Sequence, residues 1–206
     1  MTKIKICGLR RQEDIVSVNL MEPDYVGFVF AKSKRQISPK EAGTLKGMLK
    51  PNIKVVGVFV NEEVSKILEL VKEGIIDIVQ LHGDEDTEYI KALTSCTTAQ
   101  IIKAIRVKDQ DSITDVKQLP GDYLLFDTYK NDNYGGSGER FDWSLLSYTK
   151  RRFFLAGGIN IENVETAIRL TRPYGIDISS GVETDGYKDR DKIIDFVKKV
   201  RTINNL

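Results

Sequence analysis

The stretch RFFLAGGINIENVETAIRLTRPYGIDISSG, residues 152–181, contains one complete strand–helix–strand unit. Its two ends are short runs of apolar and β-branched residues, which are typical of buried parallel strands. Between these runs, Val164, Ala167 and Ile168 recur at the spacing of a single helix face. The pattern predicts two parallel strands that are joined by a crossover helix.

The same unit recurs along the whole chain. Eight short apolar runs alternate with longer amphipathic segments, and 206 residues shared among eight runs leave about 26 residues for each unit. That length fits a strand, a helix and two short loops. Ser38-Pro39 and Asn61 lie where helices are expected to begin. The eight runs are residues 3–7, 25–30, 53–60, 76–82, 100–107, 122–128, 152–157 and 175–181.

Consecutive units with right-handed crossovers favour closure into a barrel. We therefore predict an α/β fold, a single (β/α)8 barrel domain over residues 1–206. The alternative is an open doubly wound sheet, which usually carries a glycine fingerprint after its first strand. Here only Cys7-Gly8-Leu9-Arg10 follows that strand. The glycine-rich segment 129–142 is predicted to be a long loop followed by a short helix.

Composition excludes several classes of function. The chain has 31 basic and 30 acidic residues and a formal net charge of +1, which argues against nucleic acid or an anionic membrane as its main partner. No apolar run approaches the roughly 20 residues of a membrane span, and the first residues do not resemble a signal peptide. Cys7 and Cys96 do not form a secreted disulfide framework, and with His82 they lack zinc-ligand spacing. We expect a cytoplasmic protein without a metal.

Cys7 is the first candidate for chemistry, because catalytic groups of such barrels lie at the carboxyl ends of the strands. Strand alternation places Cys7 and Lys5 on the same face, toward the barrel lumen, and Ile4 and Ile6 on the other. A neighbouring ammonium favours the thiolate, the form that acts as a base or nucleophile, so Lys5 is expected to lower the pKa of Cys7. The alternative interpretation is a small buried thiol.

Three further side chains lie at predicted strand ends or in the loop that follows a predicted strand. Asp127 follows an apolar run, where burial favours a proton-donating acid, although it also fits a loop cap. Arg35, in AKSKRQIS, suits two-pronged binding of a carboxylate, whereas Lys32 and Lys34 are expected to be solvated. His82 is either a hydrogen-bonding residue of the lumen or a helix cap.

Small residues follow the last two strands. Gly157, Gly158, Ser180 and Gly181 leave backbone N–H groups accessible near helix starts, which favours an anion. These are the loops that bind phosphate in many barrels. Each cluster taken alone also fits a plain tight turn, whereas the two together predict a phosphate site.

The strings KICGLR, VGFVF, VQLHGDE, LLFDT, GGSGERFDW, LAGGINIENV and DISSGVE, in this order over residues 3–183, closely resemble the phosphoribosylanthranilate isomerases of tryptophan biosynthesis. The resemblance implies an Amadori rearrangement, without any cofactor, of N-(5-phosphoribosyl)anthranilate to 1-(2-carboxyphenylamino)-1-deoxyribulose 5-phosphate. It implies that Cys7 is the general base, Asp127 the general acid and Arg35 the contact of the anthranilate carboxylate. The implied phosphate contacts are Gly157, Gly158, Ser180 and Gly181.

This resemblance also sets the expected partners and the alternatives. The partner is a phosphorylated small molecule, the chain is a monomer or a homodimer, and the loop 135–141 is expected to close over the substrate. Another phosphosugar barrel is the alternative enzyme, although an epimerase would need a metal site and indole-glycerol-phosphate synthase a catalytic lysine and glutamate pair. A non-catalytic phosphate-binding barrel is the alternative from another class, and retention of both Cys7 and Asp127 argues against it.

Overall fold

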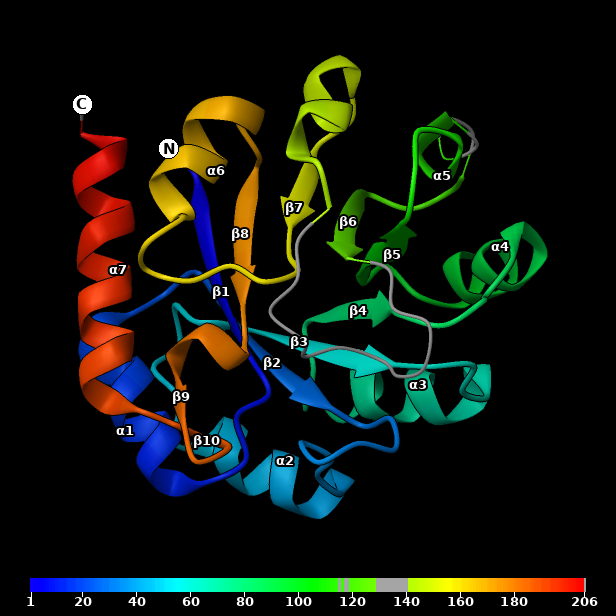
Figure 1. Ribbon diagram of the computed structural model, residues 1–206. Helices are drawn as coiled ribbons and strands as arrows, with labels where there is room; N and C mark the ends of the chain where they lie inside the picture. Colours follow the sequence, from blue (N-terminus) through cyan, green and yellow to red (C-terminus); the bar gives the residue numbers. More distant parts are fainter. Residues whose placement is uncertain (115, 117–118, 129–140, 206) are drawn as a thin grey trace.

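The predicted barrel is confirmed. The computed structural model describes residues 1–114, 116, 119–128 and 141–205. Eight parallel strands pair in sequence order, and β1 also pairs with β8, so that the sheet closes on itself (Figure 1). The strands are β1 (Lys3–Cys7), β2 (Tyr25–Val29), β3 (Lys54–Phe59), β4 (Ile78–Leu81), β5 (Gln100–Val107), β6 (Tyr123–Thr128), β7 (Phe153–Leu155) and β8 (Gly175–Ile178).

Helices surround the barrel and bury its outer face. After β5 and β6 the described residues form only the short α5 and the 3-10 helix η2. The helices that follow these two strands are therefore shorter than the predicted strand–helix alternation implies. The predicted short helix after segment 129–142 is η2, whereas residues 129–140 lie outside the described part of the chain. The helices are α1 (Gln12–Met21), α2 (Pro39–Gly47), α3 (Val64–Lys72), α4 (Thr87–Cys96), α5 (Asp111–Thr114), η2 (Trp143–Tyr148), α6 (Val164–Thr171) and α7 (Arg190–Asn204).

The two predicted helix starts had different outcomes. Ser38 caps α2, because its Oγ accepts the Glu41 N–H and the Glu41 carboxylate accepts the Ser38 N–H, a complete capping box. Asn61 was the wrong residue for α3, which begins after Glu63. Asn61 instead has a left-handed backbone with φ of 50°, and its side chain accepts a hydrogen bond from the Asp84 N–H at 2.8 Å. It therefore joins two loops and starts no helix.

The lumen changes from aromatic to charged along the barrel axis. As alternation predicts, Lys5 is fully buried inside, whereas Ile4 and Ile6 pack against the outer helices. Tyr25 and Tyr123 meet Phe154 edge to face near the amino-terminal end, with ring centroids 5.5 and 5.7 Å apart. This aromatic layer fills the amino-terminal half of the barrel, so polar chemistry belongs at the carboxyl-terminal mouth.

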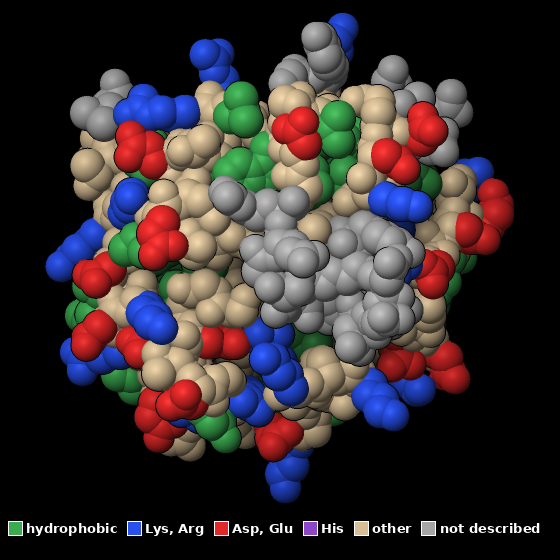
Figure 2. Space-filling view, in the orientation of Figure 1, with side chains coloured by type: hydrophobic (Ala, Val, Ile, Leu, Met, Phe, Trp, Pro, Cys, Tyr) green, Lys and Arg blue, Asp and Glu red, His purple; other side chains and the backbone are tan. Residues whose placement is uncertain are grey.

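The two ends of the chain meet beside α6 and α7 (Figure 1). Asn204 accepts the Thr2 N–H at 2.8 Å and donates to the Thr2 carbonyl at 2.9 Å, which ties the last helix to the first strand. Basic and acidic side chains are interspersed over the face shown in Figure 2. Within the described residues, no helix is both long enough and apolar enough to cross a membrane.

Between β8 and α7 the chain forms a small hairpin at the barrel mouth. The 3-10 helix η3 (Ser180–Val182) leads into β9 (Glu183–Thr184), which pairs with β10 (Tyr187–Lys188) in antiparallel fashion. Arg10 and Arg11 stack on the Tyr187 ring, each 4.4 Å from its centroid. Both also donate to hairpin carbonyls, so the loop after β1 holds the hairpin in place.

Candidate active site

Cys7 lies at the carboxyl end of β1 as a partly exposed free thiol. Its neighbour across the β1–β2 pair is Gly27. A methyl group at position 27 would come within 2.5 Å of the Cys7 sulfur, so only glycine leaves room for the thiol here. The sequence therefore provides the space for Cys7 on the adjacent strand.

Lys5 forms an ion pair with Asp177 and does not interact with Cys7 alone. Its Nζ donates to Asp177 Oδ2 at 2.8 Å, and the two residues face each other in the β1–β8 register. Burial raises the pKa of the Cys7 thiol and outweighs the Lys5 ammonium, which lowers it, while the Asp177 carboxylate raises it again. The predicted lowering of this pKa was therefore wrong in its net direction, because desolvation and an unforeseen carboxylate oppose the lysine.

Asp127 and His82 meet at the ends of β6 and β4. Of the two roles predicted for His82, it therefore has that of a hydrogen-bonding residue of the lumen, and Asp86 caps the following helix. His82 Nε2 lies 3.2 Å from Asp127 Oδ2, and Gln80 Nε2 lies 2.8 Å from His82 Nδ1. Because an amide nitrogen only donates, Nδ1 accepts and the ring proton is on Nε2, facing Asp127. The backbone N–H of Thr128 binds the other oxygen, Oδ1, at 2.8 Å. The carboxylate is thus held at both ends, with 18% of its side chain exposed at the mouth.

Arg35 comes from the loop after β2 and packs directly over Gly8 at the end of β1. Its Nε and Nη2 donate to the two oxygens of Glu183 at 2.7 and 2.8 Å. Lys188 donates to the same carboxylate at 2.6 Å and to the Ser179 carbonyl at 2.9 Å. Ser179 Oγ in turn donates to the Cys7 carbonyl at 2.9 Å. A continuous polar network thus connects Arg35 with the backbone of Cys7.

The four residues predicted to bind phosphate lie in two loops that touch. Gly157 and Gly158 have φ of 79° and 67°, a left-handed backbone that favours glycine. A side chain at Gly181 would collide with the carbonyl oxygen of Ile159, so the loop after β7 packs against η3, which contains Ser180 and Gly181. The structure therefore brings the two predicted clusters together, and their role in binding phosphate stays a prediction.

Sequence reasoning missed four polar residues of this mouth: Gln80, Asp177, Glu183 and Lys188. Alternation offered a signal for the first two, because Gln80 shares a strand face with His82, and Asp177 shares one with Ser179. Among the described residues, Gln80 Oε1 and Asp177 Oδ1 are buried without a hydrogen-bond partner. Buried unpaired oxygens are costly, so a ligand that donates hydrogen bonds would be stabilised here.

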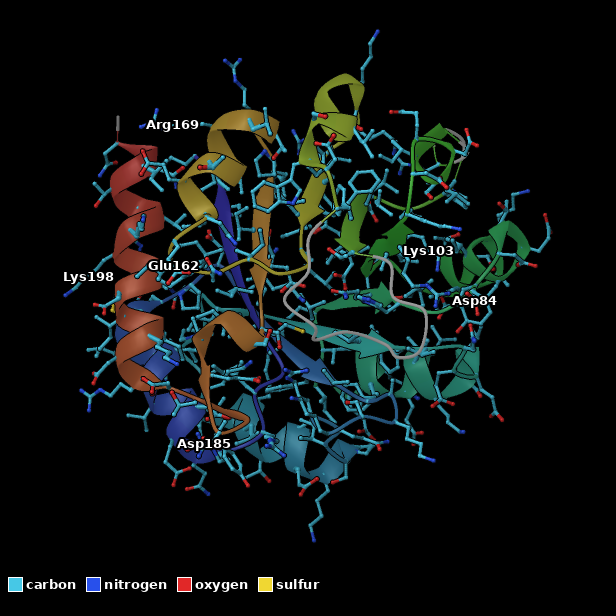
Figure 3. All side chains as sticks on the ribbon, in the orientation of Figure 1. Asp84, Lys103, Glu162, Arg169, Asp185 and Lys198 are labelled. Atoms are coloured by element: carbon cyan, nitrogen blue, oxygen red, sulfur yellow. The ribbon has the colours of Figure 1, made fainter. Side chains whose placement is uncertain are left out.

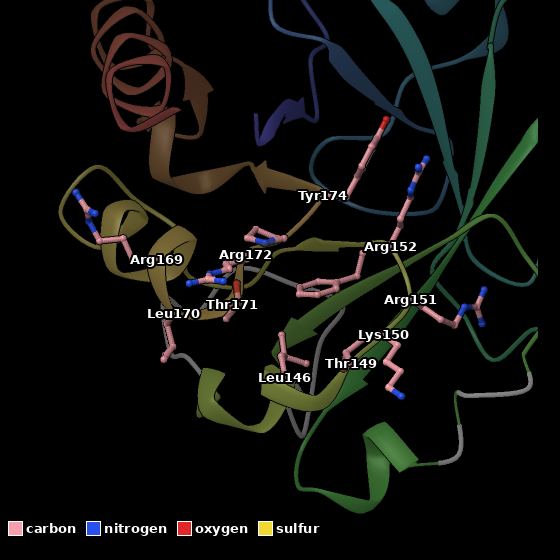
Figure 4. Close-up of a pocket in the computed structure, with 12 residues that line it drawn as sticks. Leu146, Thr149, Lys150, Arg151, Arg152, Arg169, Leu170, Thr171, Arg172 and Tyr174 are labelled. Carbon is pink, nitrogen blue, oxygen red and sulfur yellow. The ribbon is translucent and has the colours of Figure 1, made fainter. Parts of the chain in front are cut away.

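A separate cavity of about 620 Å³ lies at the amino-terminal end of β7 and β8, lined by several cations (Figure 4). Arg151, Arg152 and Arg169 point away from one another in this view. Arg151 donates to the Leu119 and Gly121 carbonyls at 2.6 and 2.7 Å, which fixes it as a structural group. The convergent polar side chains are those at the carboxyl-terminal mouth, where the sequence placed the site.

A closed (β/α)8 barrel with a thiol, a histidine-bound carboxylate and an arginine at its mouth belongs to the class of barrel enzymes that move protons on a bound small molecule. Comparison with known proteins makes this specific. The family model described as N-(5'phosphoribosyl)anthranilate (PRA) isomerase matches residues 4–199. The chain belongs to this family.

Individual relatives agree with this assignment. The N-(5'-phosphoribosyl)anthranilate isomerase of Acetivibrio thermocellus is 48% identical, and the alignment covers 98% of this chain and 96% of that protein. The crystal structure of the Thermotoga maritima isomerase has a TM-score of 0.87 and 41% identity, covering 98% of this chain and 100% of that one. A second isomerase structure, in complex with reduced 1-(o-carboxyphenylamino)-1-deoxyribulose 5-phosphate, has a TM-score of 0.85, 37% identity and the same coverage. The prediction of an isomerase of tryptophan biosynthesis is confirmed.

Proposed function

We propose that this chain isomerises N-(5-phosphoribosyl)anthranilate to 1-(2-carboxyphenylamino)-1-deoxyribulose 5-phosphate, with Cys7 as general base and Asp127 as general acid. The observation that carries these roles is the common position of the two groups. Cys7 is the last residue of β1 and Asp127 is the penultimate residue of β6. In the closed barrel, β7 and β8 separate these two strands on one side and β2 to β5 separate them on the other. A ligand in the mouth therefore has one proton-transfer group on either side.

The reaction needs a proton delivered and a proton removed. Asp127 protonates the furanose ring oxygen, so that the C1–O bond breaks and the electron pair on nitrogen forms an iminium. The iminium acidifies the C2 hydrogen, which the Cys7 thiolate takes. The resulting enolamine tautomerises to the ketone. His82 and the Thr128 N–H fix the two oxygens of Asp127, so its orientation is set before the ligand arrives.

The polar ends of the substrate fit the two sides of the mouth. We assign the anthranilate carboxylate to Arg35, whose planar fork suits a carboxylate. We assign the phosphate to the backbone around Gly157, Gly158, Ser180 and Gly181, where the loops after β7 and β8 touch. The loop 135–141, expected to close over the substrate, lies outside the described residues except for Phe141. A cytoplasmic location stays a prediction from the sequence.

Single substitutions test the two catalytic roles. Cys7→Ala and Asp127→Asn should each lower kcat by about 10²–10⁴, the usual contribution of general acid–base catalysis. The measurement is the loss of substrate fluorescence as phosphoribosylanthranilate, generated in situ, is consumed. Cys96→Ser is the matched control, because Cys96 is an exposed free thiol on α4. A folded variant that keeps wild-type turnover would remove its residue from the mechanism.

The state of assembly is tested separately. A solved structure of the T. maritima isomerase is described as monomers generated from a dimeric enzyme, and it is 38% identical to this chain. For this chain the sequence predicts a monomer or a homodimer, and sedimentation velocity distinguishes the two by mass.

A further inference from the structure

Asp177 is a buried charged group that has no role in the proposed acid–base chemistry. It lies on β8 directly opposite Lys5, with 8% of its side chain exposed, and it binds the fully buried Lys5 ammonium through Oδ2. Its second oxygen, Oδ1, is buried and has no partner among the described residues. A carboxylate that only neutralised a structural lysine would be expected to have both oxygens satisfied.

Lys5 stands between two groups that compete for it. Asp177 lies on one side at 2.8 Å, and Cys7 lies two residues further along the same face of β1. With Cys7 as a thiol, the Lys5 ammonium and the Asp177 carboxylate balance each other. Ionising Cys7 adds a second negative charge beside a single ammonium in a desolvated lumen, which is unfavourable.

We propose that Asp177 is a positioning residue for Cys7: it shares the buried Lys5 ammonium with the thiol, and it thereby decides the pH at which Cys7 becomes a thiolate. The inference deepens the proposed function and rests on Cys7 being the base. It assigns Asp177 a task that acts on the reacting group only through Lys5.

Other charged groups around Cys7 and Asp177 come from separate elements. Burial and Asp177 raise the pKa of Cys7, whereas Lys5 and Lys188 lower it. Burial raises the pKa of Asp177 as well, and Lys5 opposes that shift. Lys188 is not in hydrogen-bond contact with Lys5 among the described residues. The remaining charged or titratable neighbours are Arg35 and Glu183, on the Cys7 side, and Asp127 and His82, on the Asp177 side.

The test is the pH dependence of alkylation of Cys7 by iodoacetamide, in a Cys96→Ser background so that Cys7 is the single thiol. Among the described residues, Asp177→Asn leaves Cys7, on the same strand, as the only acidic group that acts on the Lys5 ammonium. We expect the alkylation midpoint to fall by about one pH unit or more, a tenfold change in the ionisation constant. The ascending limb of kcat/KM should move in the same direction.

Asp24→Asn is the matched control. Asp24 also binds a lysine of β1, Lys3, at 2.6 Å, but at the amino-terminal end of the barrel. Its removal should leave the alkylation midpoint and the pH profile where they are in the wild type. A folded Asp177→Asn protein whose midpoint equals that of Asp24→Asn would overturn the inference.

If the Asp177→Asn variant does not fold, a double variant with two neutral side chains provides the test instead. Lys5→Met combined with Asp177→Asn removes both charges of this buried pair together. Because the lysine acts on Cys7 more strongly than the aspartate, the midpoint should then rise above the wild-type value, and an unchanged midpoint would refute the inference. Cys7→Ala separates this from the proposed function. An active Cys7→Ala enzyme would reject Cys7 as the base, whereas an inactive one with an unmoved midpoint in Asp177→Asn would reject only the role of Asp177.

Discussion

Arg35 binds Glu183 with one edge of its guanidinium group, through Nε and Nη2. A guanidinium has five N–H donors, so its Nη1 edge can bind a second carboxylate in the same plane. Glu183 therefore orients the Arg35 guanidinium group without occupying the edge that would bind a second carboxylate. Lysine has no second edge of this kind, which makes Arg35→Lys an informative substitution.

Arg35→Ala should mainly raise KM, by about 10- to 100-fold, which corresponds to losing one charge-assisted hydrogen bond of roughly 1.5–3 kcal/mol. Arg35→Lys should recover part of this loss, because the charge returns without the fork. Steady-state kinetics with the same fluorescence assay provide the values. Lys34→Ala is the control, since that side chain is exposed. A larger effect of Lys34→Ala would show that the wrong cation was assigned.

Glu183 should make stability depend on pH in a defined window. Burial alone raises its pKa, but hydrogen bonds and charge from Arg35 and Lys188 outweigh burial and lower the pKa from 4.5 to about 2. A depressed folded-state pKa stabilises the protein above the unfolded value near 4.5, and this contribution disappears as the pH falls toward 2. The shift corresponds to roughly 3 kcal/mol.

Urea unfolding from pH 7 down to pH 2 measures this contribution. The difference in unfolding free energy between the wild type and Glu183→Gln should be full at neutral pH and shrink below about pH 4.5. Glu162→Gln is the control, because Glu162 is an exposed residue of the loop before α6 (Figure 3). A difference that stays constant through this pH range would contradict the ionised network.

At the scale of elements, neighbouring strands position Cys7 more than its own strand does. Gly27 on β2 leaves the space that the sulfur occupies, and Asp177 on β8 engages the lysine beneath it. The β9–β10 hairpin contributes Lys188, which fixes Ser179 and through it the Cys7 carbonyl. The thiol is therefore held by three elements other than its own strand, which suits a group that must be placed within a fraction of an ångström.

Gly27→Ala tests this placement. The added methyl group would lie 2.5 Å from the Cys7 sulfur and 3.0 Å from its Cα, so the thiol has to move. We expect kcat to fall by about 10²-fold, because small misplacements of reacting groups have effects of that size. Overpacking should also lower the unfolding free energy by roughly 1–3 kcal/mol.

Gly43→Ala is the matched control for that substitution. Gly43 lies within α2, and the nearest atom to an added methyl group is 3.7 Å away, an ordinary contact. Alanine there should keep kcat and raise the unfolding free energy by about 0.4–1 kcal/mol. Equal kcat values in the two alanine variants would show that Gly27 does not position the thiol.

At the scale of the whole molecule, the barrel and much of its mouth could be predicted from the sequence. Strand alternation placed Lys5 in the lumen and Cys7 at its end, because buried parallel strands have a simple period of two. The pairing of Lys5 with Asp177 could not be predicted, because it depends on the β1–β8 register across 172 residues. The same limit applies to Arg35 and Glu183, which lie 148 residues apart and meet only when the barrel closes.

A buried ion pair connects three consecutive strand–helix units at the barrel mouth. Lys103 of β5 donates to Glu85 Oε2 and to the Gly83 carbonyl, both at 2.7 Å, and lies near Asp84 in Figure 3. Glu85 also accepts the Asn61 N–H at 2.8 Å. The pair therefore connects the loop after β3, the loop after β4 and the strand β5, and both side chains are buried.

Glu85→Gln should destabilise the barrel by about 3–5 kcal/mol, because it leaves the Lys103 ammonium buried without a counter-charge. Urea unfolding at pH 7 measures the loss. Glu88→Gln on α4 is the control, since the Glu88–Lys91 pair is exposed and should change stability by about 0.5 kcal/mol or less. Adding Lys103→Met to Glu85→Gln should restore part of the stability, because the uncompensated charge is then removed. If Glu85→Gln and Glu88→Gln unfold at the same urea concentration, the Lys103–Glu85 pair does not stabilise the junction between β5 and the loops after β3 and β4.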